Sequence, residues 1–352
     1  MEELLSLTDC CRRNIGRLIR RETLTDHDVE TIFHTLLSDI GQDLSDEEAT
    51  VLAGLLVAIA MQGETVAQLV GAARGMRRHA HRIQVIGSPV VDIVGTGGDS
   101  LNTFNISTTS AFVAAGAGVI IAKHGNRAAS GKCGSADVLE LCGVNLAVAP
   151  ERVEEFVAEI GIGFLFAQKF HPAMRRVAPV RKRLGIRTIF NLLGPLTNPA
   201  GASCVLLGVY DPTLTEMFAE ALKELGCRRA MVVYGNDGMD ELTVTTHSRV
   251  TELIDGRTRT YDFFPEQYFI DGPADIDELR GGDAIQNAEI LRGILEGTIQ
   301  GAKRNIVLLN AGVAIFCSGT ADTMESGIRL ATESIDSGSA LEKLNRLVAV
   351  SQ

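Results

Sequence analysis

The first eighty residues alternate apolar and polar positions at the spacing of α-helices. One run that shows this spacing consists of Val29, Ile32, Phe33, Leu36 and Leu37. Residues three and four apart share one helix face, so the run predicts an amphipathic helix, and Thr25 precedes it as a capping residue. Ser45 stands three residues before Glu48, which is a capping-box pattern, and a further helix is predicted over Val66–His79. Residues from about 10 to 81 are therefore predicted to form helices only.

From residue 90 the pattern changes to short apolar runs that alternate with helical segments. The predicted strands are Val90–Val94, Val119–Ala122, Val144–Ala147, Gly163–Gln168, Ser203–Val209 and Arg229–Val233. The predicted helices between them are Ala111–Ala117, Ala136–Leu141, Glu151–Ile160 and Thr213–Leu225. This alternation is typical of parallel βα units whose helices cover a sheet. A β excursion at Ser248–Asp271 follows, and the last predicted helices are Asp283–Ile299, Lys303–Cys317, Met324–Ser337 and Ala340–Val348.

The composition fits a compact α/β enzyme. Of the 352 residues 45% are hydrophobic and 22% are charged, and 36 are glycines, which argues against a disordered or fibrous chain. The chain has 33 Lys and Arg against 44 Asp and Glu, so its net charge of −11 gives no overall attraction for nucleic acid. A polyanionic ligand must therefore bind at a local basic site.

The cysteines and the N-terminus indicate an intracellular setting. The seven cysteines are an odd, unpatterned set without a C-x-x-C motif, which predicts reduced thiols. The first residues show no basic stretch followed by an apolar core, as a secretory signal would. The longest apolar run near them, Val51–Met61, is too short to span a bilayer. We expect a soluble cytoplasmic protein with no membrane partner.

A glycine-rich turn follows the first predicted strand. The turn is Gly95-Thr96-Gly97-Gly98-Asp99, and Asn105-Ile106-Ser107-Thr108 then opens an alanine-rich helix. Glycines let a backbone approach a ligand closely, and the N–H groups of a helix start attract phosphate oxygens. The turn lacks the dinucleotide pattern G-x-G-x-x-G, and Gly131-Lys132-Cys133 does not form a P-loop. We therefore predict a phosphate site, with a structural turn and an ordinary helix cap as the plain alternatives.

A second polar cluster, Lys123-His124-Gly125-Asn126-Arg127, follows the strand predicted over Val119–Ala122. A lysine at this strand end can neutralise a pyrophosphate as a point charge, while His124 and Asn126 could line an organic acceptor. Ser135 offers another hydroxyl just before the next predicted helix. A hydrogen-bonded core histidine is the plain alternative for His124.

Two adjacent carboxylates, Asp240 and Glu241, lie in a glycine-rich loop after a predicted strand. In an open α/β sheet, ligands bind at the carboxyl ends of the strands. Mg²⁺ is usually held by one or two carboxylates plus substrate oxygens, so we favour a metal role over a solvated pair. Acid–base work on a glycoside is disfavoured, because neighbouring residues rarely place carboxyls on opposite faces of a sugar.

The segment from 171 to 199 is dense in basic side chains and is expected to close over an anionic ligand. These residues are His171, Arg175, Arg176, Arg181, Lys182, Arg183 and Arg187. The segment ends in Asn191-Leu192-Leu193-Gly194-Pro195-Leu196-Thr197-Asn198-Pro199.

Taken together, these motifs resemble those of anthranilate phosphoribosyltransferases, which catalyse the second step of tryptophan biosynthesis from chorismate. The resemblance rests on the glycine turn, the Asn-Ile-Ser-Thr and Lys-His-Gly-Asn-Arg-Ala stretches, Gly134-Ser135-Ala136-Asp137, Phe170-His171-Pro172, the 191–199 segment and Asp240-Glu241. The motifs occur in the family's order and spacing and cover nearly the whole chain. The resemblance implies transfer of a 5-phosphoribosyl group from phosphoribosyl pyrophosphate to the amine of anthranilate.

The resemblance also implies an architecture. The fold class is then α/β, with a small all-helical N-terminal domain joined by hinges to a larger α/β domain with a mostly parallel central sheet. We place the small domain at residues 1–85, completed by helices from about 170–200, and the larger donor-binding domain at 86–352. Members of the family are commonly homodimers that contact through the small domain, so a homodimer is expected here.

Site residues are carried over position by position. The residues implied for phosphoribosyl pyrophosphate are Gly95, Gly98, Asp99, Thr103, Asn105, Ser107, Thr108, Lys123 and Ser135. Those implied for anthranilate are Gly95, His124, Asn126, Arg181, Gly194 and Pro195, with Arg181 meeting the carboxylate. Ser107, Asp240 and Glu241 are implied as ligands of Mg²⁺, with two ions per monomer. Lys123, Asp240 and Glu241 are the predicted catalytic residues.

Two other functions share this fold. Pyrimidine nucleoside phosphorylases also have a glycine-rich phosphate loop, but the Lys-His-Gly-Asn-Arg stretch and the paired Asp240-Glu241 argue against them. A non-catalytic, nucleic-acid-binding relative should show a basic surface and a damaged metal or acceptor motif. This chain is acidic and has both motifs intact.

Overall fold

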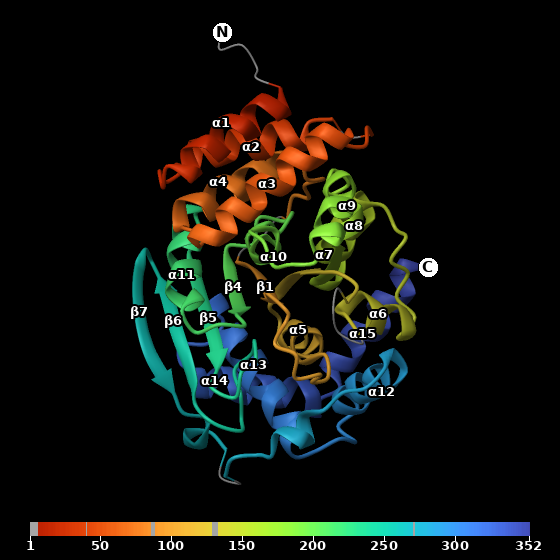
Figure 1. The fold of residues 1–352 in the computed structure, drawn as a ribbon. Coiled ribbons are helices and arrows are strands. Elements are labelled where there is room, and N and C mark those ends of the chain that lie inside the picture. The colour runs from red at the N-terminus through yellow and green to blue at the C-terminus, as the bar shows by residue number, and fades with distance from the viewer. Residues whose placement is uncertain (1–5, 40, 86–88, 129–132, 270–271) are drawn as a thin grey trace. The chain divides into compact units, whose positions relative to one another are not determined.

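The computed structural model describes residues 6–39, 41–85, 89–128, 133–269 and 272–352 (Figure 1). Gly131 and Lys132, considered above as a phosphate loop, and the end of the predicted β excursion, Ile270–Asp271, lie outside these residues. The chain divides into two compact units. One comprises Met1–His81 and Gln168–Pro199, and the other comprises Arg82–Ala167 and Ala200–Gln352.

The smaller unit is built from helices, as predicted. Its first four are α1 (Leu7–Ile19), α2 (Asp26–Leu37), α3 (Asp46–Gln62) and α4 (Val66–Arg78). The chain then passes through the larger unit and returns to the smaller one. The returning segment forms α8 (Ala167–Phe170), α9 (Met174–Leu184), α10 (Phe190–Leu193) and the 3₁₀ turn η1 (Gly194–Leu196). Helix α2 packs on α4, and α1 packs on α3. A Cβ on Gly71 would overlap the carbonyl of Asp26, so this glycine permits the close α2–α4 approach.

Both predicted N-caps of this unit are present. Thr25 and Ser45 each accept from the backbone N–H three residues on, which completes capping boxes with Asp28 and Glu48. Asp28 also pairs with Arg17 of α1 at 2.7 Å. Burial tends to raise the pKa of Asp28, but hydrogen bonds from Arg17 and Thr25 outweigh it and lower the pKa from 3.8 to about 2.

We expect Asp28→Asn to lower the free energy of unfolding by about 1 kcal/mol at neutral pH, because it weakens the capping box and removes a partly solvated ion pair. The folded pKa lies below the unfolded one, so this stabilisation is present above about pH 4 and is lost as the pH falls towards 2. Denaturant unfolding at several pH values measures the difference. Asp46→Asn, in the exposed first turn of α3, is the matched control. An equal loss in both variants, or a difference that persists at pH 2, would contradict the expectation.

The larger unit contains a sheet of seven strands in the order β3-β2-β1-β4-β5-β6-β7. They are β1 (Val90–Gly95), β2 (Ile120–Gly125), β3 (Ile162–Phe166), β4 (Cys204–Gly208), β5 (Arg229–Gly235), β6 (Ser248–Ile254) and β7 (Arg257–Phe263). The first five in this order are parallel, and β6 and β7 add antiparallel at one edge. The predicted β excursion is thus a hairpin that extends the sheet.

The strand order reverses between β1 and β4. From β1 the chain continues outward through β2 and β3, then returns to β4 on the other side of β1. Ligands of open α/β sheets bind in the crevice outside the carboxyl ends of strands at such a switch point. The glycine turn after β1 lies at this position.

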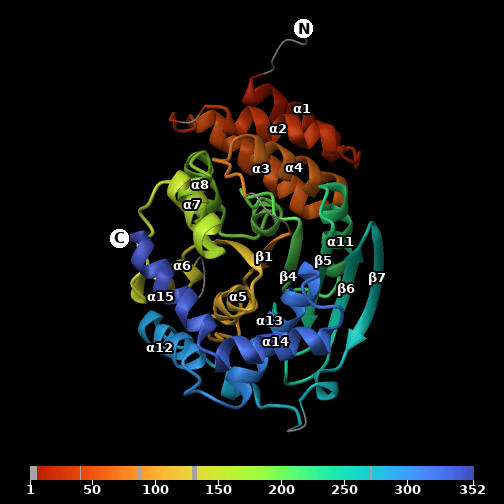
Figure 2. The same ribbon diagram turned by 180° about the vertical axis from the view of Figure 1, so that it is seen from behind.

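Helices of the larger unit cover the sheet and supply its core. They are α5 (Ile106–Gly116), α6 (Ser135–Leu141), α7 (Pro150–Ile160), α11 (Leu214–Glu224), α12 (Ala284–Leu295), α13 (Ala302–Ser318), α14 (Met324–Asp336) and α15 (Ser339–Ser351). Helix α5 packs on β1 and β2, and α13 packs on β4 and β5. Helices α12 to α15 all contact α5 and surround it (Figure 2). The helix that starts at the phosphate motif is therefore embedded on several sides.

The predicted strand Val144–Ala147 is wrong. Gly143 ends α6 with a positive φ of 98°, and the N–H of Val144 donates to the carbonyl of Leu139 in a helix-ending turn. Val144 and Leu146 are buried in the core without joining the sheet. Only a short turn then separates them from Pro150, which begins α7, so the apolar run reflects burial and not strand formation.

Each described helix is too short or too polar to cross a lipid bilayer. All seven cysteines are free thiols.

Candidate active site

Two glycines that face each other across adjacent strands make room for an acidic loop. Gly95 and Gly208 are register partners at the carboxyl ends of β1 and β4. A Cβ on Gly208 would overlap the carbonyl of Asp240, and a Cβ on Gly95 would overlap its carboxylate. The N–H of Gly97 donates to Asp240 Oδ2 at 2.7 Å. The structure therefore brings together the glycine turn and Asp240, which the sequence separates by more than 140 residues.

The turn itself requires glycine. Gly97 and Gly98 have φ values of 69° and 88°, in the region that side chains disfavour. Asp99 accepts from the N–H of Leu101 at 3.3 Å. Burial raises the pKa of Asp99, and the charge of Asp237 adds to this. The turn thus carries a second partly buried carboxyl close to Asp240.

The first turn of α5 presents polar atoms that the helix does not use. Asn105 occupies the N-cap position but makes no side-chain cap hydrogen bond, so the ordinary-cap alternative fails here. Within the described part of the chain, Asn105 Oδ1 and Thr108 Oγ1 are buried and have no hydrogen-bond partner. Buried polar atoms normally have partners, so these two oxygens are available to a ligand or a water. Thr103, just before the helix, forms an isolated β-bridge with Arg280.

Lys123 extends from the end of β2 towards β1 and α5. Its side chain is only 4% exposed, and Nζ donates to the carbonyl of Ile93 at 2.5 Å and to Ser107 Oγ at 3.4 Å. Burial lowers the pKa of Lys123, while the charges of Asp92, Glu241 and Asp240 oppose this. A buried ammonium among three carboxylates beside a helix start is suited to binding a polyphosphate.

The loop that carries the acidic pair is held by its own hydrogen bonds. The carboxylate of Asp237 accepts from the hydroxyls of Thr243 at 2.5 Å and Thr245 at 2.6 Å. The N–H of Gly235 donates to the carbonyl of Met239 at 2.9 Å, which closes the turn after β5. These contacts fix the path of the chain on either side of Asp240.

Asp240 and Glu241 are carboxyls in a crowded, desolvated position. Burial raises the pKa of Asp240 to about 7, with the charge of Asp99 adding to it. Burial and then Asp240 raise the pKa of Glu241 to about 8, against the effect of Lys123. A divalent cation would favour the ionised form of both groups, since opposite charge stabilises a buried carboxylate.

The donor set fits Mg²⁺ bound together with a substrate. Among the residues described, no group of three or more His, Cys, Asp or Glu side chains is arranged to hold a metal without further ligands. Mg²⁺ seldom uses such a cage, and takes one or two carboxylates plus waters and phosphate oxygens. Two adjacent carboxylates and a nearby hydroxyl, that of Ser107, match this requirement.

His124 and Asn126 lie at the end of β2. His124 is 5% exposed, and its backbone N–H donates to Asp92 Oδ1 at 3.1 Å. Asn126 Oδ1 accepts from the N–H of Arg127 at 2.8 Å, and its carbonyl accepts from Ser135 Oγ at 3.2 Å. Ser135 and Asn126 are therefore neighbours, although nine residues separate them.

The remaining predicted acceptor residues belong to the smaller unit. The guanidinium of Arg181, in α9, lies over the ring of Phe190 at 5.5 Å from the centroid. Burial lowers the pKa of Arg181, and no described carboxylate lies within 4.0 Å of it. Gly194 and Pro195 form the start of η1. Arg176, by contrast, donates to the carbonyl of Leu36 at 3.0 Å, so this member of the basic segment serves the packing of the unit.

Asp92 is a site residue that the sequence reading missed. It is fully buried in β1, accepts from the N–H of His124, and acts electrostatically on Lys123. The sequence does contain a sign of this role. Asp92 is a charged residue inside the apolar run Val90–Val94, where a buried charge is costly unless it has a partner.

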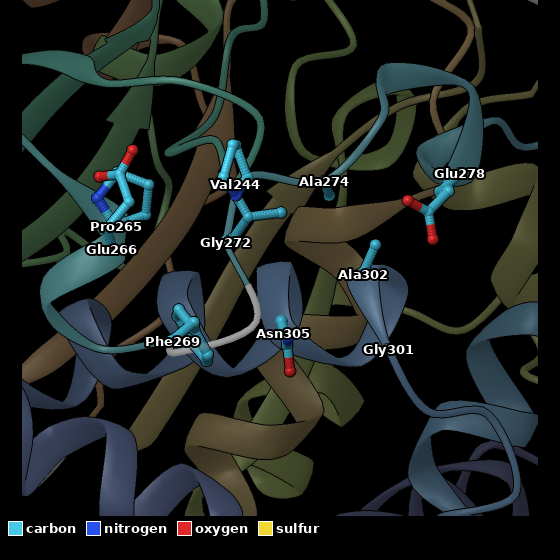
Figure 3. A pocket seen from close by; sticks show the side chains of 11 residues that line it. Val244, Pro265, Glu266, Phe269, Gly272, Ala274, Glu278, Gly301, Ala302 and Asn305 are labelled. Atoms are coloured by element: carbon cyan, nitrogen blue, oxygen red, sulfur yellow. The ribbon is translucent and has the colours of Figure 1, made fainter.

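A pocket of about 230 Å³ lies elsewhere in the larger unit, lined by residues that include Val244, Phe269 and Ala302 (Figure 3). None of the predicted site residues lines this pocket. Its walls mix apolar side chains with Glu266 and Glu278, and no described Lys, Arg or His lines it, whereas a phosphate site is expected to include a cation. The candidate site is therefore identified by the chemistry at the switch point and not by this pocket.

Known sequences match both units. Residues 87–341 match the α/β domain of the glycosyl transferase family, and residues 12–80 match the helical bundle domain of that family. An anthranilate phosphoribosyltransferase of Desulfatibacillum aliphaticivorans is 55% identical over 337 residues, covering 91% of this chain and 99% of the relative. The enzyme of the same name from Desulfosudis oleivorans is 52% identical and covers 96% of this chain and 97% of its own.

Solved structures of proteins with the same name also match this chain. Anthranilate phosphoribosyltransferase from Thermus thermophilus matches with a TM-score of 0.89 and 43% identity, covering 96% of this chain and 98% of that chain. The enzyme of that name from Saccharomyces cerevisiae, in complex with phosphoribosyl pyrophosphate and magnesium, matches with a TM-score of 0.88 and 28% identity, covering 97% of both chains. Another structure of the yeast protein is a complex with 4-fluoroanthranilate.

Proposed function

The chain belongs to the anthranilate phosphoribosyltransferase family, and we propose that it transfers the 5-phosphoribosyl group of phosphoribosyl pyrophosphate to the amine of anthranilate. The products are N-(5-phosphoribosyl)anthranilate and pyrophosphate. The observation in the molecule that carries this is the convergence of Lys123, the first turn of α5 and the Asp240-Glu241 loop at the β1–β4 switch point. The high identity to relatives named anthranilate phosphoribosyltransferase favours this acceptor over a nucleobase or a nucleic acid.

We assign the donor to the β1–α5 half of the site. The proposed residues are Gly95, Gly98, Asp99, Thr103, Asn105, Ser107, Thr108, Lys123 and Ser135. The unpartnered oxygens of Asn105 and Thr108 and the positive end of α5 support this assignment. Lys123 lies beside Ser107, where it can neutralise charge on the pyrophosphate.

We also propose that Ser107, Asp240 and Glu241 hold Mg²⁺, with two ions in each chain. The fit of the carboxylate pair to Mg²⁺ and the magnesium in the yeast complex support this. Bound at these residues, Mg²⁺ would supply positive charge that offsets the negative charge of the pyrophosphate oxygens.

For the acceptor we propose Gly95, His124, Asn126, Arg181, Gly194 and Pro195. Arg181 has a guanidinium without a carboxylate partner among the described residues, and its planar fork can bind both oxygens of the anthranilate carboxylate. The 4-fluoroanthranilate complex of the yeast relative supports an acceptor site of this kind in the family.

The chemistry then needs positioning more than proton transfer. The amine nitrogen of anthranilate forms a bond to C1′ of the ribose as the bond from C1′ to the pyrophosphate oxygen breaks, and the electron pair leaves with pyrophosphate. The proton lost by the amine leaves the site on the departing pyrophosphate, so an aryl amine held beside C1′ needs no strong base from the protein. Lys123 stabilises the charge that develops on the leaving group. Exclusion of water protects the activated ribose from hydrolysis.

The assembly and location are further parts of the proposal. We propose a homodimer through the smaller unit, in which Ile19 and Met61, which are 75% and 83% exposed, would be contact residues. The seven free thiols support a cytoplasmic location. The net charge of −11 argues against a nucleic-acid partner.

Purified protein should consume anthranilate, followed by loss of its fluorescence, only when both phosphoribosyl pyrophosphate and Mg²⁺ are present. Omission of either, or chelation of the metal, is expected to stop the reaction. The control is the same mixture with free phosphate and a pyrimidine nucleoside, where no phosphorolysis is expected. Absence of turnover in the complete mixture would overturn the assignment.

Arg181→Ala is expected to raise KM for anthranilate by about tenfold, because the substrate carboxylate loses a charge-assisted hydrogen-bonding partner. KM for phosphoribosyl pyrophosphate should change much less. Steady-state kinetics with each substrate varied in turn measures both constants. Lys182→Ala, whose side chain is exposed on the same helix, is the control. Equal effects of Arg181→Ala on the two KM values would remove the carboxylate role.

A further inference from the structure

A buried asparagine of α13 holds the chain directly after the acidic pair. Asn310 is fully buried, and its Oδ1 accepts from the N–H of Leu242 at 3.1 Å. Its Nδ2 donates to the carbonyl of Leu242 at 2.9 Å and to that of Ile306 at 2.9 Å. One side chain thus binds both polar backbone groups of the residue that follows Asp240-Glu241.

A second buried asparagine, in α12, holds the start of the donor-binding helix. Asn287 is 2% exposed, and its Oδ1 accepts from the N–H of Asn105 at 3.2 Å. Its Nδ2 donates to the carbonyls of Gly282 at 3.0 Å and Asp283 at 2.8 Å. A Cβ on Gly281 would come within 2.7 Å of Asn287 Oδ1 and 2.8 Å of the Cα of Phe104, so the segment is closely packed here.

These contacts differ from ordinary helix packing in what they bind. The Oδ1 atom of each asparagine accepts a hydrogen bond from a backbone N–H in a segment that carries proposed ligand-binding residues. Asn310 both accepts from and donates to the backbone of Leu242, which fixes the orientation of that residue. Asn287 instead links the N–H of Asn105 to the carbonyls at the start of α12. The two held segments follow β1 and β5, while the two asparagines lie on α12 and α13, which come after the last strand in the sequence.

We propose that Asn310 and Asn287 are positioning residues, which set the metal-binding loop and the donor-binding helix start through their backbones without touching either ligand. This inference rests on the proposed function, because it takes Asp240-Glu241 as the metal ligands and Asn105 as a donor residue. Residues that orient the ligands of a metal commonly affect its affinity strongly. The helices α12 and α13 thereby contribute to substrate binding although none of the proposed site residues lies on them.

The test compares Asn310→Ala and Asn287→Ala with Ser334→Ala. Ser334 is a matched control, because it is 3% exposed and its Oγ donates to the carbonyl of Val113 at 2.8 Å, at the opposite end of α5. Calorimetric titration with phosphoribosyl pyrophosphate, at low and at excess Mg²⁺, measures donor binding without turnover. Thermal unfolding of each variant reports the loss of stability separately.

We expect Asn310→Ala to raise the donor Kd about tenfold at low Mg²⁺ and to recover most of the loss at excess Mg²⁺. Asn287→Ala should raise the donor Kd by a similar factor at both Mg²⁺ concentrations, since it disturbs the phosphate side. Ser334→Ala should lower the unfolding temperature with no change in Kd. If Asn310→Ala does not fold, Asn310→Ser, which retains a hydroxyl, is measured in its place.

Donor Kd values equal to that of Ser334→Ala in both positions would show that the asparagines serve stability alone and would overturn the proposal. Loss of donor binding at both positions without any difference in Mg²⁺ response would overturn the division of roles. A failure of the proposed function is a separate result, because the unmodified protein would then not turn over anthranilate at all.

Discussion

Lys123→Met is expected to lower kcat by about 10²–10³-fold, because it removes the buried cation proposed to stabilise charge on the leaving pyrophosphate. The ammonium is held in place by the carbonyl of Ile93 and lies within 3.4 Å of Ser107 Oγ. Methionine has a similar length and no charge, so it fills the space without replacing the interaction. Steady-state kinetics at saturating Mg²⁺ measures the loss.

The same change is expected to destabilise the fold. Lys123 interacts electrostatically with Asp92, Glu241 and Asp240, and removal of one member of a buried ionic group costs about 3 kcal/mol or more. Lys223→Met, on the surface of α11 and paired with Glu220, is the control and should affect neither kinetics nor stability appreciably. Nearly normal kcat in Lys123→Met would show that pyrophosphate departs without this cation.

Gly208→Ala is expected to impair metal-dependent activity by at least about tenfold and to lower the free energy of unfolding by about 1–3 kcal/mol. The added methyl group overlaps the carbonyl of Asp240, so the acidic loop must move away from the sheet. Because backbone is the obstacle, no side-chain rotation can relieve the overlap. The Mg²⁺ concentration for half-maximal rate should rise, and this is the quantity to measure.

The control for Gly208→Ala is Gly16→Ala in α1. A Cβ there has only the end of the Arg20 side chain within 4 Å, at 3.8 Å, and alanine favours helices more than glycine does. We expect that variant to be as stable as the unmodified protein or slightly more so, with unchanged Mg²⁺ dependence. If Gly208→Ala had a normal Mg²⁺ dependence, contact of Asp240 with the sheet would not determine metal binding.

Features encoded in short stretches could be predicted from the sequence. The N-caps at Thr25 and Ser45 and the helices they begin depend on residues three or four apart, and they form as predicted. The glycine turn after β1 was also predictable, because an apolar run that ends in glycines marks a strand end. Asp240 is found beside this turn, as a site at the strand ends requires.

Features that depend on burial in the folded core or on distant partners could not be predicted. The apolar run at Val144 has the composition of a strand, yet its backbone is taken by a helix-ending turn. Asp92 holds His124 from the neighbouring strand, and Asn310 holds Leu242 from 68 positions away. A single sequence does not show whether a buried asparagine binds the backbone of a loop or only packs in the core.

The glycine pair at the ends of β1 and β4 also determines how the acidic loop could be transplanted. Neighbouring strands lie about 4.8 Å apart. The backbone of Asp240 lies over Gly208, and the carboxylate of Asp240 lies over Gly95 on the adjacent strand. A parallel sheet that received residues 235–245 as a graft would therefore need glycine at both underlying positions and the same alignment of the two strands. The loop and the ends of β1 and β4 therefore act as one unit. Neither the loop nor the strand ends are expected to bind metal if they are moved alone.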